Sequence, residues 1–183
     1  MQGQIQPHFI FNTLSAVQHW VDSGDARAGP LLRSLTAFLR GSTELLSRDT
    51  VRLGDELAMV GHYLDIMQAR LGDRLDRKLT IDAQLNDQQL PPGLLLTLVE
   101  NAVEHGISAA LNGGCVSVAA QAQPGGWCVV VHDDGAGLPA GWTEGVGLAN
   151  SRQRLAHHFG ARAQLAVRAT QPGTEARITI ADA

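Results

Sequence analysis

The sequence predicts an α+β chain, with a helical region over residues 1–74 followed by an α/β sandwich over residues 75–183. Two patterns lead to this prediction. In the first region apolar residues recur three or four positions apart, the period of helices with one buried face. In the second, runs of β-branched residues alternate with glycine-rich turns and two further helical stretches. This order of elements is typical of a mixed sheet with its helices on one face.

The helical region is expected to contain three helices. Residues 2–21 and 29–46 each carry an apolar stripe, and residues 23–25 (Ser-Gly-Asp) provide the turn between them. These two helices should form an antiparallel hairpin. A lone hairpin cannot cover both apolar faces, so we expect it to pair with a second copy, giving a homodimer with a four-helix bundle. A third helix, at residues 53–71, connects the hairpin to the sandwich.

The sandwich is expected to combine five strands with two helices. A polar turn at residues 86–89 and the Pro-Gly-Gly signal at 124–126 separate neighbouring elements, and the glycine-rich span 135–147 has the composition of a mobile lid. The predicted strands are residues 78–83, 115–123, 127–132, 163–169 and 174–181, and the predicted helices are residues 91–106 and 148–159.

The composition excludes several classes of function. With 183 residues, 44% of them hydrophobic, the chain can bury a core, and its formal net charge of −4 argues against nucleic acid as a direct partner. Lys78 is the only lysine and lies far from any glycine-rich loop. P-loop enzymes and eukaryotic-type protein kinases both need a lysine at the phosphates. Any use of ATP must therefore rely on another fold.

The sequence also bears on localisation. No apolar run approaches the ~20 residues that span a membrane, and no signal peptide is visible. Motif sequence follows Met1 at once, which suggests a longer protein whose N-terminal segment could hold a membrane anchor. We therefore expect the cytoplasmic portion of an inner-membrane-anchored protein. Cys115 and Cys128 lie in neighbouring predicted strands and are expected to be buried, reduced thiols, which suits the cytoplasm.

The helix predicted at residues 91–106 carries more polar residues than packing requires. Pro91 and Pro92 provide its start and Gly106 its end. Its apolar residues share one face, so the polar residues gather on the other side and toward the C-terminal end. These residues are Thr97, Glu100, Asn101, Glu104 and His105.

Further along, Asp133 follows a predicted strand and precedes Gly135 and Gly137. A glycine loop after a strand lets the backbone approach a ligand closely. An aspartate at the strand end is a fixed acceptor for a donor such as an exocyclic amine. This pattern is weak alone, because a DxGxG sequence is often only a hairpin turn.

Two later glycine motifs complete an ordered set. Gly145, Gly147 and Leu148 belong to a GVGL sequence that opens a helix, whose free N–H groups and dipole can face phosphate. Gly173 and Thr174 come directly before the last predicted strand. The helix motif, the strand-end aspartate and these two motifs, in this order, are far more specific than any one of them.

Residues 90–183 resemble the ATP-binding domain shared by histidine kinases, gyrase, Hsp90 and MutL, which has the Bergerat-type fold. The resemblance implies ATP and Mg²⁺ as cofactors. It implies that Asn101 holds Mg²⁺, that Asp133 reads adenine and that Thr174 helps at the adenine end. The other nucleotide-binding positions that the match implies are His105, Gly135, Gly137, Gly145, Gly147 and Leu148.

The segment QIQPHFIFNTL, residues 4–14, places His8 on a predicted helix and Asn12 one turn further along the same face. It resembles the phospho-acceptor motif of the LytS-like sensor histidine kinases, which include AlgZ-type proteins, and the likeness continues through residues 62–75 and 91–107. The resemblance implies that His8 takes the γ-phosphate and passes it to an aspartate on a response regulator receiver domain, of the LytTR type in this family. A neutral imidazole suits this role, because one ring nitrogen has a free lone pair.

Three positions depart from the related families. Many histidine kinases place an acid directly after the histidine, where this chain has Phe9, so the base is expected at Glu100 or Glu104. Gyrase-like and MutL-like ATPases activate water with a glutamate where this chain has Thr97, so direct hydrolysis should be poor.

Glu104 itself replaces a lysine found in many kinases, and its charge would repel triphosphate unless Mg²⁺ or an arginine compensates. The nearest cations in the sequence are Arg152 and Arg154, either as phosphate ligands or as exposed helix charges.

Three functions remain open at this point. The favoured one is a sensor histidine kinase core, with dimerisation and phospho-acceptor helices plus a connecting helix in residues 1–74 and the catalytic ATP-binding domain in residues 75–183. The second is an ATP-binding, phosphatase-biased regulator with weak kinase activity, which Phe9 and Glu104 favour and in which Asn12 would orient a water. A gyrase- or MutL-type ATPase is the least favoured, because of Thr97. Incubation with labelled ATP would distinguish the three functions, since they predict labelled protein, nucleotide binding alone and steady phosphate release, respectively.

Overall fold

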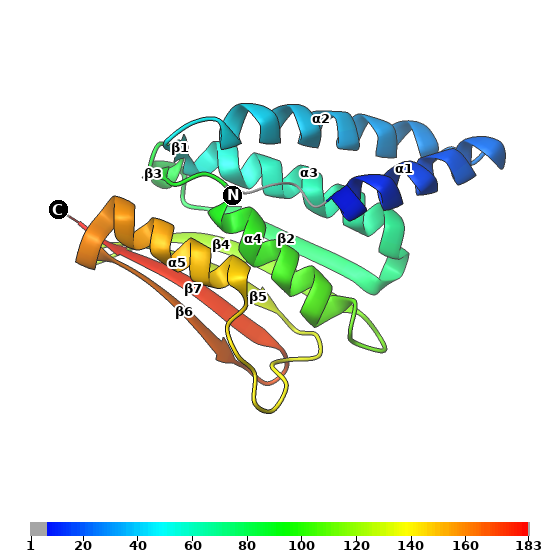
Figure 1. Cartoon of the computed structure of the whole chain (residues 1–183). Helices are drawn as coiled ribbons and strands as arrows, with labels where there is room; N and C mark the ends of the chain where they lie inside the picture. Colours follow the sequence, from blue (N-terminus) through cyan, green and yellow to red (C-terminus); the bar gives the residue numbers. More distant parts are fainter. Residues whose placement is uncertain (1–6, 183) are drawn as a thin grey trace.

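The computed structural model describes residues 7–182, and its N-terminal region folds into the three predicted helices (Figure 1). The part of the first predicted helix that precedes Pro7 lies outside the described residues. The first two helices form the expected hairpin, and the Trp20 carbonyl accepts the Asp25 N–H at 2.8 Å where the chain turns. The helices are α1 (Pro7–Asp22), α2 (Ala28–Leu46) and α3 (Leu53–Leu71).

The second half of the chain is a five-stranded mixed sheet with helices across one face, which confirms the α+β class (Figure 1). Its elements are β2 (Leu75–Ile81), α4 (Leu94–Asn101), a π-helix (Ala102–Ile107), β4 (Gly114–Gln123), β5 (Gly126–Asp133), α5 (Val146–Phe159), β6 (Ala163–Ala169) and β7 (Thr174–Ala181), with 3₁₀ turns at Gly72–Arg74, Ala83–Leu85 and Gly160–Arg162. The strand order is β2-β4-β5-β7-β6. β2 runs parallel to β4, and the other neighbouring pairs are antiparallel.

The first sheet strand begins earlier than predicted. β2 covers residues 75–81 rather than 78–83, because Leu75 is buried and the inward-outward alternation of side chains starts with it. Residues 83–85 form a 3₁₀ turn instead, which the Asp82 carbonyl stabilises by accepting the Leu85 N–H at 2.8 Å.

Two short strands were not predicted. β1 (Val51–Arg52) pairs antiparallel with β3 (Gln89–Leu90), so the polar turn expected at residues 86–89 ends in a strand. Strands of two residues have no hydrophobic period that a sequence pattern can reveal. The helix predicted at 91–106 also differs, since it begins at Leu94 and changes to a π-helix after Asn101.

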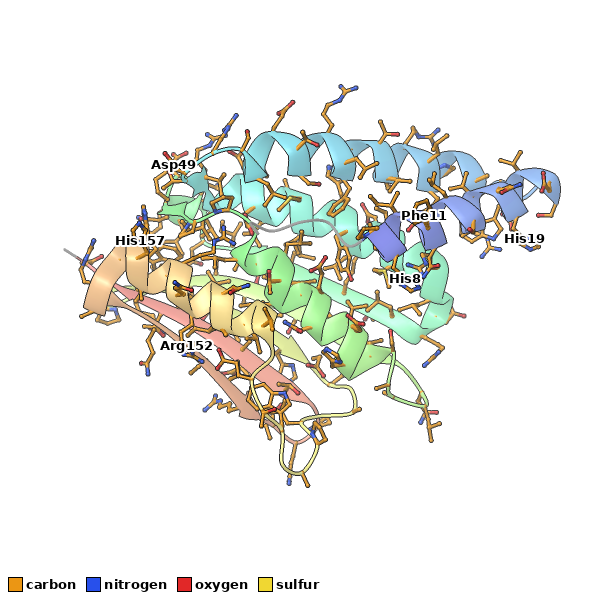
Figure 2. All side chains as sticks on the ribbon, viewed as in Figure 1. His8, Phe11, His19, Asp49, Arg152 and His157 are labelled. Carbon is orange, nitrogen blue, oxygen red and sulfur yellow. The ribbon has the colours of Figure 1, made fainter. Side chains whose placement is uncertain are left out.

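α3 joins the two halves of the molecule, because it packs against α2 on one side and against α4 and β2 on the other. The Phe9 ring lies 5.4 Å from that of Phe38 and 5.3 Å from that of Tyr63, measured between ring centroids, so the three rings form an aromatic cluster of α1, α2 and α3. The hairpin therefore buries part of its apolar surface on α3, which the sequence had assigned to a second copy alone. Large apolar side chains remain exposed on the hairpin, namely Phe11, Leu14, Val21 and Leu32. Figure 2 shows Phe11 on α1.

Cys115 and Cys128 are free cysteines on β4 and β5. Cys128 is buried as predicted, whereas the prediction of a buried Cys115 is wrong, because its side chain is only partly covered. No helix within residues 7–182 combines the length and the apolar character needed to cross a membrane.

Candidate functional site

Asp133 ends β5 in the wall of a cavity of about 570 Å³, and only 3% of its surface is exposed. The cavity lies between the π-helix, the loop after β5 and strands β6 and β7. Its walls are mainly apolar with a few polar groups, as in most sites for small organic ligands. It brings together seven of the residues that the sequence predicted, namely Asn101, His105, Asp133, Gly137, Gly145, Leu148 and Thr174.

Glycines allow the backbone to close around Asp133. A Cβ on Gly106 would collide with the Asp133 carboxylate, and a Cβ on Gly173 would collide with its carbonyl oxygen. Gly135 packs on the Gly106 carbonyl, and its N–H donates to Asp133 Oδ1 at 3.1 Å. Burial raises the pKa of Asp133, and the Gly135 hydrogen bond opposes this effect. Gly135 therefore holds the aspartate in place and does not line the cavity.

The steric argument gives a first prediction. Gly106→Ala should displace the Asp133 carboxylate and weaken ATP binding roughly tenfold or more, since overpacking costs about 1–3 kcal/mol. Titration calorimetry with Mg-ATP measures this change. Gly61→Ala in α3 is the matched control, because a Cβ there meets no atom within 4 Å. An unchanged dissociation constant in folded Gly106→Ala would show that the Asp133 carboxylate is not held as described.

Asn101 lies at the junction of α4 and the π-helix, and π-turns occur frequently at functional sites. Its Nδ2 donates to the Thr97 carbonyl at 2.8 Å, which fixes the amide and leaves Oδ1 able to bind a cation. Among residues 7–182, no group of three His, Cys, Asp or Glu side chains could hold a metal alone. Mg²⁺ commonly takes one or two protein oxygens together with substrate phosphates. The Asn101 amide therefore fits Mg²⁺ that arrives with a phosphate ligand.

A larger cavity of about 1280 Å³ adjoins the first and shares Asn101, Glu104, His105 and Gly145 with it. Gly145 precedes α5 and has no side chain to cap the helix, so the first N–H groups of α5 are available to an anion. A Cβ on Gly147 would lie 3.3 Å from the Thr97 Cγ2 atom, so α4 and the start of α5 meet closely here. This end of the site suits a polyphosphate.

Glu100 and Glu104 are further polar groups at this end, and both line the larger cavity. Burial raises the pKa of Glu100 to about 7, with a smaller contribution from the charge of Glu104. A carboxyl group with such a pKa can exchange a proton at neutral pH.

The adenine end predicted from the sequence has a simple geometry. Thr174 stands directly opposite Asp133 in the β5–β7 ladder, so the two side chains reach the cavity from neighbouring strands. Leu148, in the first turn of α5, is buried and contributes an apolar wall.

Both arginines considered as phosphate ligands donate to backbone carbonyls, and Arg154 also lines the larger cavity. Arg152 forms an ion pair with Glu144 at 2.9 Å and donates to the Leu165 carbonyl. Arg154 donates to the Pro92 carbonyl, before the start of α4. Each side chain therefore has a structural role in this conformation, which the sequence did not anticipate.

His8 lies exposed in the first turn of α1 (Figure 2). Asn12 Nδ2 lies 3.0 Å from His8 Nε2 and 3.2 Å from Nδ1, as expected for residues one helical turn apart. Neither residue lines either cavity. The structure thus separates His8 and Asn12 from the site that contains Asn101 and Asp133.

The sequence patterns missed Glu56, which is fully buried in the first turn of α3. Its carboxylate accepts hydrogen bonds from backbone N–H groups at the start of α4. One signal was present, because Glu56 occupies the same helical face as Leu53 and Val60, where an apolar residue is expected. A carboxylate on the apolar face of a helix indicates a buried partner.

Two family models match the chain. One, described as "Histidine kinase", covers residues 1–75, and the other, described as "Histidine kinase-, DNA gyrase B-, and HSP90-like ATPase", covers residues 87–183. Similar curated proteins include the sensor protein LytS of Oceanobacillus iheyensis, 30% identical over 95% of this chain, and the sensor histidine kinase BtsS of Escherichia coli, 34% identical over 98%. The chain spans 32% of the length of each of these relatives.

Solved structures share the fold. The histidine kinase domain of a blue-light activated histidine kinase from Erythrobacter litoralis superposes with a TM-score of 0.58 at 23% identity, covering 92% of this chain and 93% of that one. Histidine kinase ThkA in complex with response regulator protein TrrA gives a TM-score of 0.55 at 13% identity, covering 96% and 59%. At these identities the likeness concerns the fold alone.

Proposed function

Because the chain belongs to the histidine kinase family and ends in the ATP-binding domain shared with DNA gyrase B and HSP90, we propose that it autophosphorylates on His8 as the core of a two-component sensor kinase. The phosphoryl group then passes to an aspartate of a response regulator. The observation that carries this proposal is a single cavity that joins the buried Asp133 to Asn101 and to the glycine start of α5.

Each part of that cavity suits a part of ATP. The Asp133 carboxylate accepts a hydrogen bond from the exocyclic amine of adenine, beside Thr174 and the apolar wall that Leu148 forms. The phosphates extend past His105 toward Gly145 and the N–H groups of α5, where the helix dipole favours negative charge. The loop glycines, Gly135, Gly137 and Gly147, keep the backbone close to the nucleotide and to Asp133.

Asn101 and Glu100 serve the phosphoryl transfer in this proposal. The Asn101 Oδ1 atom would hold Mg²⁺, which when bound offsets the triphosphate charge and that of Glu104. A lone pair of the His8 imidazole forms a bond to the γ-phosphorus while the bond to the bridging oxygen breaks and ADP leaves. Glu100, on the wall of the larger cavity, accepts the imidazole proton.

The transfer requires α1 to approach the nucleotide, because His8 lies outside both cavities. The exposed apolar side chains of the hairpin support a homodimer, in which a second copy covers them. Phe11 and Val21 on α1 are 68% and 63% exposed, and Leu32 on α2 is 47% exposed. Surface of this kind on neighbouring helices is typical of a bundle interface.

The remaining partners follow from the family. The regulator is proposed to be a receiver domain of the LytTR type, and direct nucleic acid binding is not part of the proposal. The similar curated sensors are about three times longer than this chain, so we propose a cytoplasmic catalytic portion that is anchored to the inner membrane through a further segment.

A second function has support from Phe9. This residue replaces the acid expected after the phospho-acceptor histidine, and it packs in the aromatic cluster with Phe38 and Tyr63. It therefore cannot act as a base or orient the imidazole. An ATP-binding regulator with weak transfer, whose Asn12 positions a water for dephosphorylation, would explain this replacement.

Incubation of the chain with Mg-ATP labelled at the γ-phosphate tests the proposal. We expect a labelled protein whose label survives alkali and is lost in acid, the behaviour of phosphohistidine, together with one ADP for each phosphoryl group transferred. Nucleotide binding without labelled protein would instead support the weak-transfer regulator. Continuous phosphate release without labelled protein would contradict both and indicate an ATPase.

A further inference from the structure

Glu56, on α3, forms hydrogen bonds with backbone N–H groups at the start of α4. Its Oε2 accepts the Gly93 N–H at 2.8 Å, and its Oε1 accepts the N–H groups of Leu95 at 3.0 Å and Leu96 at 3.4 Å. The carboxylate is fully buried on α3, 37 to 40 residues away in the sequence. Burying an acid is costly unless its oxygens are hydrogen-bonded, as they are here.

α4 has no cap of its own. The residue before it, Gly93, adopts a left-handed conformation with φ of 75° and has no side chain that could accept the first N–H groups. The Glu56 carboxylate replaces that cap. Burial raises the pKa of Glu56 to about 7, while the hydrogen bonds that it accepts from backbone N–H groups favour its charged form at the positive end of the helix dipole. The position of this helix start therefore depends on α3.

A residue of α5 also contacts the segment at the start of α4. Arg154 donates to the Pro92 carbonyl, and its positive charge opposes the rise in the pKa of Glu56 that burial causes. Three helices thus meet at the segment from Pro92 to Leu96. α5 begins at Gly145, where the phosphates are proposed to bind, and α4 carries Asn101 one to two turns after the held segment.

α3 also contacts α1, the helix that carries His8, the proposed phospho-acceptor. Two turns after Glu56 it presents Tyr63, whose ring packs 5.3 Å from that of Phe9, the neighbour of His8 in α1. A single rigid helix therefore contacts the acceptor helix at one point and the nucleotide helix at another. Rigid elements of this kind fix the distance between two groups that must react.

From this arrangement we propose that Glu56 is a positioning residue for phosphoryl transfer, which fixes α4, and with it Asn101 and Glu100, relative to α3. The inference rests on the proposed kinase function. It assigns Glu56 no contact with the nucleotide. Its effect should fall on the transfer step, because Asp133 at the adenine end belongs to β5, which Glu56 does not touch.

Glu56→Gln tests the assignment, since glutamine has nearly the same volume but only one acceptor oxygen. At a temperature where circular dichroism shows it folded, the variant should label His8 roughly 10- to 100-fold more slowly at saturating Mg-ATP, because small displacements of reacting groups cost rates of this size. Its KM for ATP should change less than about threefold. Asp55→Asn, at a partly exposed neighbour on α3 that pairs with Arg52, is the matched control and should behave like the unsubstituted chain.

Two results would overturn the proposal. One is a folded Glu56→Gln that labels at the original rate. The other is a slower rate that follows the folded fraction alone, which indicates a purely structural cap. If Glu56→Gln does not fold, Glu56→Asp decides, since it keeps the charge but shortens the side chain, and full labelling by folded Glu56→Asp excludes a positioning role. Failure of the unsubstituted chain to label would reject the kinase proposal itself and is thereby distinguished.

Discussion

His8→Gln is expected to abolish labelling of the protein by γ-labelled ATP while leaving its ATP affinity unchanged. Glutamine keeps a polar side chain but has no basic nitrogen lone pair, so the covalent acceptor is removed and the reaction does not merely become slower. The affinity should persist because His8 lines neither cavity of the nucleotide site. Autoradiography of the protein and calorimetry with ATP measure the two effects.

His19→Gln is the matched control for this experiment, because His19 lies on the same helix and is also exposed. It should label like the unsubstituted chain. Label retained by His8→Gln would place the acceptor at another residue, and loss of label in both variants would indicate a disturbed α1.

Asp133→Asn should weaken ATP binding by roughly 10- to 150-fold, since hydrogen bonds to charged groups contribute about 1.5–3 kcal/mol. Asparagine can still accept the Gly135 N–H through its Oδ1 atom, so the loop should keep its conformation. What is lost is the negative acceptor for the adenine amine. Calorimetric titration with ATP and with ADP should show the same loss, because the adenine is common to both nucleotides.

Asp134→Asn controls for the change in charge at the same loop. Asp134 Oδ1 accepts the Cys115 N–H at 2.6 Å, its side chain is exposed, and it does not line the cavity. This variant should bind ATP with its original affinity. An undiminished affinity in folded Asp133→Asn would contradict the assignment of the whole nucleotide site.

The parts of the fold that the sequence predicted well are those with a local signal. Helices α1, α2 and α3 show an apolar stripe over several turns, and β5 leads directly into a glycine-rich loop, so their existence and order were predicted correctly. The structure also brings Asn101 and Asp133, which belong to motifs with fixed spacing, into one cavity, while their roles at a nucleotide stay predictions.

What the sequence did not predict depends on partners far apart in the chain. The β1–β3 pair joins residues about 40 positions apart and has no period of its own. Glu56 looks like an ordinary acid in a first helical turn, and Arg154 looks like a surface charge, until the fold brings both to the start of α4. The position of Glu56 on an apolar helix face indicates that it has a buried partner, but the sequence does not show that this partner is the backbone of α4.

The π-helix after Asn101 has a consequence for the spacing of the nucleotide motif. A π-turn holds one residue more than an α-turn, so the polypeptide between Ala102 and Ile107 is one residue longer than a regular helix of the same hydrogen-bond count. Gly106, the residue that faces the Asp133 carboxylate, lies within this π-helix. Deleting one residue between Ala102 and Gly106 is therefore expected to turn a residue with a side chain toward the aspartate, so the length of this segment matters as well as its residue types.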